Sequence, residues 1–324
     1  MTSVLVFGEL TGGHLSVMAA ELIALGNKLD CEVTVAVLGD NLESVAEEAG
    51  SRGADRVYVV RDPLLRDLQE DAVTAALEKL CKQIVPDIVL VGKTLIGLNI
   101  GPRLAFRLDG GLAQDCISLE MDQGKLVAVR PVYGGNALAT ISFPEDRTRI
   151  AVVRAKIYEP QPPDSSRKAE VVTFEPKLDP SVIKTKMVET VKNEPKGVQL
   201  EDTDVVVSGG RGLGGPESFA KLRELASLLK GAVGASRAAC DAGWLDHSYQ
   251  VGLTGKTVTP DLYIAIGISG ASQHMAGCSG AKNIVAMNKD ESANIFKDAQ
   301  YGVVGDWKNI LPSFIETVRE LVKS

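Results

Sequence analysis

The sequence has few of the residues from which metal and disulfide sites are built. Its 324 residues include only five cysteines and three histidines, and no two cysteines form a C-x-x-C pair. Zinc and iron–sulfur sites need clustered soft ligands, so we expect no metal site. Isolated cysteines usually behave as small core residues. The residues concerned are Cys31, Cys81, Cys116, Cys240, Cys278, His14, His247 and His274.

Two further absences narrow the class of protein. No apolar run reaches the roughly 18 residues that a membrane span requires, so we predict a chain that does not cross a membrane. The net charge of -7 gives no general basic surface for nucleic acid. The start, MTSVLVFGEL, lacks the basic region of a secretory signal. We therefore expect a cytoplasmic protein, or a mitochondrial matrix protein if a transit peptide has been removed.

What the chain does contain is a regular alternation of apolar strands and helices. With 324 residues, 45% of them hydrophobic, it is long enough for two domains. Its first strands are nearly continuous apolar runs, which suit parallel strands covered on both faces. This βαβ alternation predicts a doubly wound sheet. The runs lie at residues 3–9, 32–39, 55–60 and 87–92.

The alternation of strands and helices stops after residue 110 and resumes later in the chain. Short strand-like segments joined by tight turns lie at residues 116–120, 126–129, 137–142 and 150–155. A stretch rich in proline and charge follows, and we place a linker in it at residues 193–203. A second α/β series then supplies strands at residues 204–209, 231–236, 262–267, 283–288 and 301–306. We predict an α/β protein of two domains: residues 1–198, a Rossmann-like parallel sheet with added antiparallel strands, and residues 199–324, a doubly wound sheet.

A glycine motif opens the second series. The stretch VVVSGGRGLGG satisfies G-x-G-x-x-G at residues 210–215, between a strand and a helix as that pattern requires. A NAD site would place an acidic residue at the end of the next strand, but this strand ends in Ser236-Arg237. An arginine there can hold a 2′-phosphate, so an NADP site stays open. A second interpretation of the motif, a simple turn between a strand and a helix without a ligand, also stays open.

Polar residues follow every strand of the second series. Ligands of open parallel sheets gather outside the carboxyl ends of the strands. Backbone N–H groups in the turn SGASQH offer a seat for pyrophosphate. We therefore expect one polar ligand along this edge. The GISGA segment resembles a nucleophile elbow, but the only later histidine, His274, lies five residues after Ser269, which excludes a serine-hydrolase triad.

The second series contains the segments VVVSGGRGLGGPESF, VGASRAACDAGW, QVGLTGKTVTPDLYIAIGISGASQHMAG and IVAMNKD. Together these four segments resemble the FAD domain of the electron transfer flavoprotein alpha subunit family. The resemblance runs in unbroken order from residue 204 to residue 324. In the first half, GPRLAFRLDGGLAQD and RPVYGGNALATI are similar to the same family. By this resemblance the second domain is an FAD-binding domain.

The resemblance implies a set of flavin contacts. Arg211 would lie close to the isoalloxazine, and Ser236 and Arg237 against the flavin and pyrophosphate, with Arg237 near the ring edge that takes electrons. His274 would face the pyrimidine end of the ring. Further implied contacts are Val251, Gly252, Leu253 and Thr254 beside the flavin (Thr254 near N5), Ser269, Gly270, Ala271, Ser272 and Gln273 on the phosphates and ribityl chain, and Asn288, Asp306 and Trp307 around the adenosine.

One position departs from the family pattern. Many members have glutamine where this chain has Leu253, so one polar contact near the flavin is not expected here. The remaining implied contacts are unaffected by this difference.

The resemblance implies an electron carrier rather than an enzyme, with no catalytic residues of its own. It would form a heterodimer with a beta subunit that holds AMP or a second FAD. Electrons would come from flavin dehydrogenases, such as the acyl-CoA dehydrogenases of fatty acid oxidation, and pass to a quinone-linked oxidoreductase. Two alternatives from other classes remain: an NADP-binding Rossmann-type oxidoreductase, and a nucleotide-binding regulatory protein without redox function.

Overall fold

The computed structural model describes residues 2–40, 42–135, 137–185, 188–189, 200–201 and 203–323. The chain divides into two compact units, one of Met1–Val132 and Leu138–Val191 and the other of Tyr133–Ala137 and Lys192–Ser324. The boundary expected between residues 198 and 199, and most of the linker expected at residues 193–203, fall outside the described residues.

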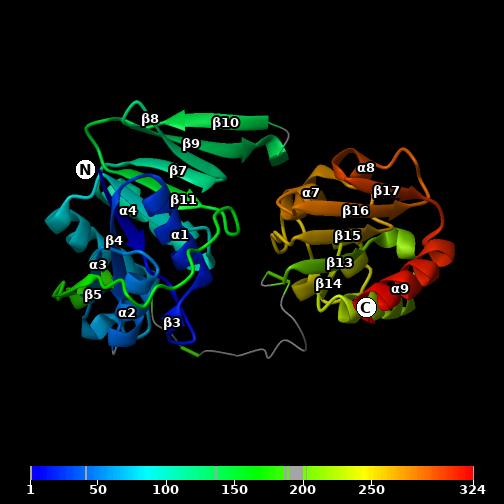
Figure 1. The fold of residues 1–324 in the computed structure, drawn as a ribbon, viewed down its shortest axis with the longest axis horizontal. Coiled ribbons are helices and arrows are strands. Elements are labelled where there is room, and N and C mark those ends of the chain that lie inside the picture. Colours follow the sequence, from blue (N-terminus) through cyan, green and yellow to red (C-terminus); the bar gives the residue numbers. More distant parts are fainter. Residues whose placement is uncertain are drawn as a thin grey trace. The chain divides into compact units, whose positions relative to one another are not determined.

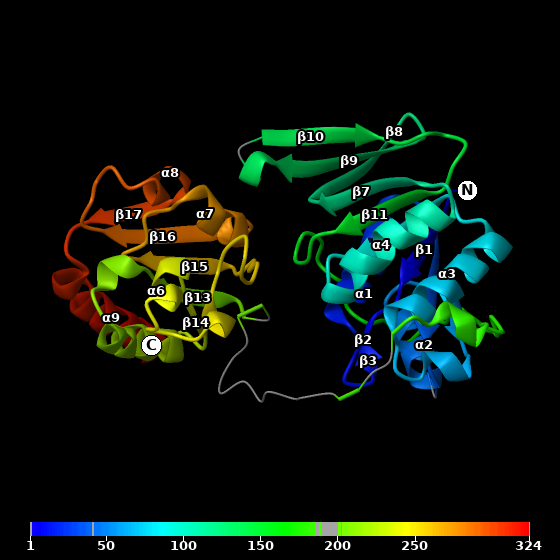
Figure 2. The same cartoon turned by 180° about the vertical axis from the view of Figure 1, so that it is seen from behind.

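A parallel sheet forms the centre of the first unit (Figures 1 and 2). Its described strands pair in the order β12-β5-β4-β1-β6-β11-β7, and every pairing is parallel. The interior strand β6 is buried along its whole length, as its continuous apolar sequence predicts. The strands are β1 (Ser3–Phe7), β4 (Glu32–Leu38), β5 (Arg56–Val60), β6 (Ile88–Gly92), β7 (Gly111–Cys116), β11 (Arg149–Val153) and β12 (Glu170–Phe174).

Helices cover both faces of this sheet. Apolar residues of α1 (Val17–Lys28) and α2 (Glu43–Ser51) pack in one core with Val4 and Val6, while α3 (Glu70–Ile84) and α4 (Leu95–Arg107) pack in the other with Leu5 and Phe7. Alternate residues of β1 thus enter opposite cores, as the two-residue period of a strand requires. The unit is therefore doubly wound.

The segment after α4 combines two kinds of strand. A separate small sheet contains β8 (Ser118–Asp122), β9 (Lys125–Val132) and β10 (Ala137–Ser142), and β8 pairs antiparallel with β9. The run at residues 150–155 instead supplies β11 of the main parallel sheet. A short antiparallel pair, β2 (Leu10–Thr11) and β3 (His14–Leu15), lies before α1.

The second unit is a smaller doubly wound sheet. Its described strands pair in parallel in the order β14-β13-β15-β16-β17. They are β13 (Val205–Gly209), β14 (Ala232–Ala235), β15 (Leu262–Ile266), β16 (Asn283–Asn288) and β17 (Tyr301–Val304). From β13 the chain first adds β14 on one side and then continues from β15 on the other. The order therefore reverses between β13 and β15, which is a topological switch point.

The helices of this unit lie on opposite faces of its sheet. Side chains of α5 (Phe219–Leu228), α6 (Arg237–Asp241) and α9 (Trp307–Lys323) pack in one core, and those of α7 (Ser272–Cys278) and α8 (Ile295–Asp298) in the other. Phe219, Leu222, Leu225 and Ala226 of α5 form a buried apolar stripe at helical spacing. Among the described residues, no helix is both long and apolar enough to cross a membrane.

Candidate functional site

A cavity of about 620 Å³ lies at the carboxyl edge of the second sheet. Its walls come from the loops after β13, β14, β15 and β16 and from the segment that joins α6 to β15. This is the edge and the switch point at which doubly wound sheets bind ligands. The lining residues are Arg211, Gly212, Ser236, Arg237, Ala238, Asp241, Gln250, Val251, Gly252, Leu253, Thr254, Gly267, Ile268, Ser269, Ala271, Gln273, His274, Asn288, Asp290 and Ala293.

The glycine motif brings two loops into backbone contact beneath this cavity. The N–H of Gly210 donates to the carbonyl of Ile266, and that of Gly212 donates to the carbonyl of Gly267, at 2.9 and 3.0 Å. A Cβ at Gly210 would lie 2.2 Å from the Gly267 oxygen, and Gly267 itself has a φ of +63°. The loops after β13 and β15 therefore cross so closely that the glycines of the motif are needed to leave room for their backbones.

Two arginines give one wall of the cavity its positive charge. Arg211 begins a short 3-10 turn after β13, and Arg237 is the first residue of α6 after β14. Arg237 Nε lies 3.4 Å from Asp241 Oδ2 one turn later, and both side chains are more than half exposed. The acidic partner reduces the net charge that Arg237 presents to a ligand.

A chain of polar side chains forms a second wall. Gln250 is only 4% exposed, and its side-chain Nε2 donates to Thr254 Oγ1 at 3.0 Å. Its Oε1 lies 2.9 Å from His247 Nδ1, and His247 Nε2 lies 3.9 Å from Asp241 Oδ1. Gln250 has a fixed orientation because both ends of its amide are engaged. It therefore holds the Thr254 hydroxyl at the cavity.

His274 enters the cavity wall from α7 and is itself buried. Its Nε2 lies 2.9 Å from the hydroxyl of Tyr263, a fully buried residue of β15. Burial lowers the pKa of His274 to about 4, and the nearby backbone of Val251 opposes that shift more weakly. The imidazole is therefore neutral near pH 7. Its Nδ1 is buried and makes no hydrogen bond within the described chain.

Asn288 and Asp290 form the rim at the end of β16. Asn288 Nδ2 donates to the carbonyl of Ile268 at 2.9 Å, which ties the loop after β16 to the loop after β15. The carboxylate of Asp290 accepts hydrogen bonds from the backbone and hydroxyl of Ser292, and these contacts lower its pKa. The rim is thus polar and locally ordered.

The structure brings most of the residues expected from the sequence to this one cavity. Those in its lining are Arg211, Ser236, Arg237, Val251, Gly252, Leu253, Thr254, Ser269, Ala271, Gln273, His274 and Asn288. Four others lie outside the lining. Gly270 packs its backbone against Ile295, Ser272 starts α7, Asp306 accepts from the backbone of Lys308, and Trp307 Nε1 donates to the Gly212 carbonyl at 3.3 Å.

Several lining residues are absent from the sequence-based set. Asp241 follows Arg237 by four residues, a spacing that forms ion pairs on a helix and offered a signal for it. Gln250 immediately precedes the expected segment, but nothing local marks it as buried. The other additions are Gly212, Ala238, Gly267, Ile268, Asp290 and Ala293. Among the described residues, no group of three or more His, Cys, Asp or Glu side chains is arranged to hold a metal ion.

Comparison with known proteins gives concordant matches along the chain. A family model described as the electron transfer flavoprotein domain matches residues 4–179, and one described as the electron transfer flavoprotein FAD-binding domain matches residues 199–279. The electron transfer flavoprotein subunit alpha of Thermoanaerobacterium thermosaccharolyticum is 43% identical over 321 residues, covering 98% of this chain and 97% of that protein.

Two other relatives cover nearly the whole chain. The electron transfer flavoprotein subunit alpha of Bacillus subtilis is 40% identical over 320 residues and covers 98% of each chain. A protein of Anaerotignum propionicum named acryloyl-CoA reductase electron transfer subunit beta is 37% identical over 350 residues, covering 97% of this chain and 95% of the relative. The similarity thus extends over both units.

Proposed function

Because this chain belongs to the electron transfer flavoprotein family, as an alpha subunit, we propose that its second unit holds FAD in the cavity described above. The protein is an electron-transfer flavoprotein, and the expectation drawn from the sequence motifs is confirmed on this point. The observation that carries the FAD proposal is the convergence of two arginines, a fixed hydroxyl and a buried imidazole on one cavity at the switch point.

The cavity fits a flavin dinucleotide in size and chemistry. Its volume is within the roughly 300–1,000 Å³ of small-molecule sites. Apolar side chains such as Val251 and Ile268 suit the faces of a flat ring, while cations and hydroxyls suit its polar edges and the phosphates. The buried Nδ1 of His274 makes no hydrogen bond of normal geometry within the described chain, so a ligand group in the cavity can complete its hydrogen bonding.

Bound FAD would supply the redox chemistry, and the side chains would position and tune it. Arg211 and Arg237 would place positive charge where reduction adds negative charge, which favours reduction. The Thr254 hydroxyl, oriented by Gln250, would meet one polar edge of the ring. The neutral imidazole of His274 would meet another. Adenosine contacts through Asn288, Asp306 and Trp307 belong to the same proposal.

An electron carrier needs no acid–base machinery, and the described cavity has no nucleophile paired with a base. The hydrogen-bond partner of His274 Nε2 is the phenol of Tyr263, not a serine. NADP fits less well, because the carboxylate of Asp241 beside Arg237 would repel a 2′-phosphate. A regulatory role without redox function would leave the family relationship unexplained.

The proposal extends to protein partners. A beta subunit carrying AMP or a second FAD, a flavin dehydrogenase such as an acyl-CoA dehydrogenase, and a quinone-linked oxidoreductase are the proposed partners, in the cytoplasm or a mitochondrial matrix. The relative named as a subunit of acryloyl-CoA reductase supports assembly with other redox chains. We propose that residues 1–198 mainly contact the beta subunit.

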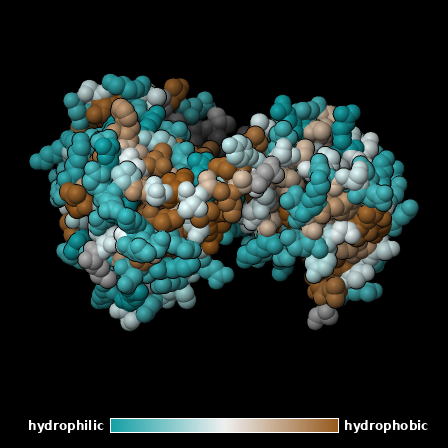
Figure 3. All heavy atoms as spheres, turned by 90° about the horizontal axis from the view of Figure 1, so that it is seen from above, coloured by the Kyte–Doolittle hydropathy of each residue, from teal (hydrophilic) through white to brown (hydrophobic). Residues whose placement is uncertain are grey.

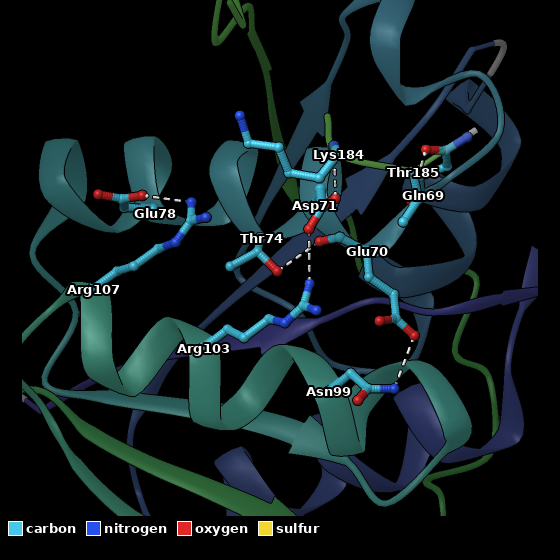
Figure 4. Close-up of polar contacts among 10 residues, drawn as sticks. All are labelled: Gln69, Glu70, Asp71, Thr74, Glu78, Asn99, Arg103, Arg107, Lys184 and Thr185. Carbon is cyan, nitrogen blue, oxygen red and sulfur yellow. Dashed lines mark hydrogen bonds and ion pairs between the residues drawn. The ribbon is translucent and has the colours of Figure 1, made fainter. Parts of the chain in front are cut away.

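Surface features of the first unit support a partner there. Leu95 and Phe106 on α4 are 86% and 88% exposed, and apolar residues reach the surface of this unit in Figure 3. Two ion pairs join the helix to α3, Arg103 with Asp71 at 2.9 Å and Arg107 with Glu78 at 3.0 Å (Figure 4). Exposed apolar side chains gathered on one helix support a protein contact there.

Anaerobic mixing tests the carrier role. The purified complex should lose its flavin absorbance when a catalytic amount of acyl-CoA dehydrogenase and excess acyl-CoA are added, and should regain it on addition of a quinone-linked acceptor. Bleaching by NADPH alone, without any dehydrogenase, would instead favour the NADP oxidoreductase. Other flavin dehydrogenases serve as further donors in the same assay.

A further inference from the structure

The hydrogen bonding of His274 is half complete in the described chain. His274 is 7% exposed, its Nε2 meets the Tyr263 hydroxyl, and its buried Nδ1 makes no hydrogen bond of normal geometry to the described residues, although the backbone of Val251 lies close enough to the ring to oppose the fall in its pKa. A neutral imidazole has one N–H donor and one bare acceptor nitrogen. Which nitrogen carries the proton therefore decides what His274 offers to the cavity that it lines.

The surroundings of Tyr263 determine the direction of this hydrogen bond. Burial raises the pKa of the phenol well above 10, so it keeps its proton and needs an acceptor. The imidazole nitrogen is a strong acceptor at 2.9 Å. The nearby Cys278 sulfur is a weak acceptor, and its own thiol is 3.6 Å from the His274 carbonyl. The phenol is therefore best satisfied by donating to Nε2.

Ser208 is the other polar neighbour of the phenol. Its buried hydroxyl makes no hydrogen bond of normal geometry in the described chain, but its proximity partly opposes the rise in the pKa of Tyr263. Because the Ser208 hydroxyl makes no hydrogen bond to the phenol, it does not compete with the imidazole for the phenol proton.

We propose that Tyr263 is a positioning residue whose hydroxyl donates to Nε2 of His274, which fixes the imidazole as the tautomer with its proton on Nδ1. His274 then offers the cavity an N–H donor rather than a bare nitrogen. The ligand group that faces it must be a hydrogen-bond acceptor, such as a carbonyl oxygen or an unprotonated ring nitrogen. Only the identification of that acceptor as part of FAD rests on the proposed function.

Nitrogen NMR on histidine-labelled protein tests the tautomer directly. The chain has three histidines, so a ¹⁵N-histidine sample of the full chain gives few ring signals, and His14→Gln and His247→Gln variants complete their assignment. At pH 7–8, with and without flavin, we expect His274 to show a protonated Nδ1 and a bare Nε2. A protonated Nε2 in the unmutated protein would overturn the proposal, whatever the variants do.

The Tyr263→Phe variant tests whether the phenol fixes that state. This variant should move His274 toward a mixture of tautomers or toward protonated Nε2. Tyr301→Phe is the matched control, because Tyr301 is 70% exposed on β17, and it should change nothing. An unchanged His274 tautomer in a folded Tyr263→Phe protein would show that Tyr263 does not set it.

Addition of FAD to flavin-depleted protein separates this inference from the proposed function. A shift of the Nδ1–H signal on flavin binding would support both. A fixed Nδ1–H tautomer that is unmoved by FAD would support the role of Tyr263 and count against the proposed FAD contact.

Discussion

The side-chain amide of Gln250 donates to the hydroxyl oxygen of Thr254 across 3.0 Å, at the wall of the cavity. Gln250 is buried and Thr254 is exposed, so a rigid residue holds a group that faces the ligand space. Because the Thr254 oxygen already accepts this hydrogen bond, its own proton remains available to a ligand.

A double-mutant cycle should detect this hydrogen bond. Gln250→Leu should lower the free energy of unfolding of the second unit by about 1–2 kcal/mol and weaken flavin retention, since it removes a buried donor and frees the threonine. With Thr254→Val, we expect a coupling energy of about 0.5–1.5 kcal/mol in denaturant titrations. Thr257→Val, an exposed threonine of the same loop, is the control. Additive effects would show that the two residues act separately.

Charge changes at α6 should move the flavin potential in opposite directions. Arg237→Ala should lower the midpoint potential by on the order of 60 mV, a tenfold change in a one-electron equilibrium, because it removes positive charge. Asp241→Asn should raise the potential, because it removes the partner 3.4 Å from Arg237. Arg237→Lys should restore part of the loss.

The measurement for α6 is a potentiometric titration of fully loaded proteins. Arg223→Ala, an exposed arginine on α5 outside the cavity lining, is the control and should leave the potential unchanged. Shifts of the same sign in the Arg237 and Asp241 variants would contradict an electrostatic origin.

The stability of the second unit should fall in mild acid because of His274. Its pKa is about 4 in the folded protein against 6.5 for the unperturbed group, so between these values the unfolded chain binds the extra proton. Stability is therefore lost as the pH falls from 6.5 toward 4, by at most about 1.4 kcal/mol per pH unit. Urea titrations should show this slope flattened in His274→Gln but kept in His247→Gln, whose side chain is exposed. An equal slope in all three proteins would contradict this assignment.

Glu21 should give the first unit the opposite pH dependence. Burial raises the pKa of this carboxyl to about 7, although it accepts a hydrogen bond from the Lys156 backbone at 2.8 Å. The folded state thus keeps a proton that the unfolded chain releases above pH 4.5, and stability falls as the pH rises from 4.5 to 7.

Hydrogen exchange of the β11 amides measures the stability of the first unit alone, so it can test the effect of Glu21 without a contribution from the second unit. Glu21→Gln, which keeps an acceptor for Lys156, should abolish the fall, and Glu47→Gln, at an exposed site, should not. If the stability of the Glu21→Gln variant still falls as the pH rises from 4.5 to 7, another group causes the fall.

The architecture followed from the sequence wherever apolar runs were continuous. The run around Ile264 is buried on both faces of its sheet, so its composition alone indicates a central parallel strand. The run at residues 150–155 looked the same as its antiparallel neighbours, and only long-range pairing with β6 and β7 shows that it belongs to the main sheet. On α9, Leu311, Ile315 and Val318 are buried in the core, but Leu321 near the end of the helix is 69% exposed.

The site residues that lie at strand ends were predictable from the sequence, whereas those whose role depends on burial were not. Arg211 and Arg237 lie two residues after the ends of β13 and β14, and Asn288 is the last residue of β16, so their place at one edge is a consequence of a parallel sheet. Tyr263 stands inside the apolar run LYIAI, where nothing in the sequence separates a polar contact from core packing. Gln250 likewise positions Thr254 only because its side chain also contacts His247, and the sequence does not show either contact.

Quantification of the nucleotide released from the purified complex tests the central claim most directly. We predict a yellow protein that releases FAD on acid treatment. Ser269→Trp, which fills the cavity from an exposed lining position, should remove about one FAD per chain, whereas Ser227→Trp, on the exposed face of α5, should keep it. A colourless protein, release of NADP, or flavin retained in full by Ser269→Trp would contradict an FAD site in this cavity.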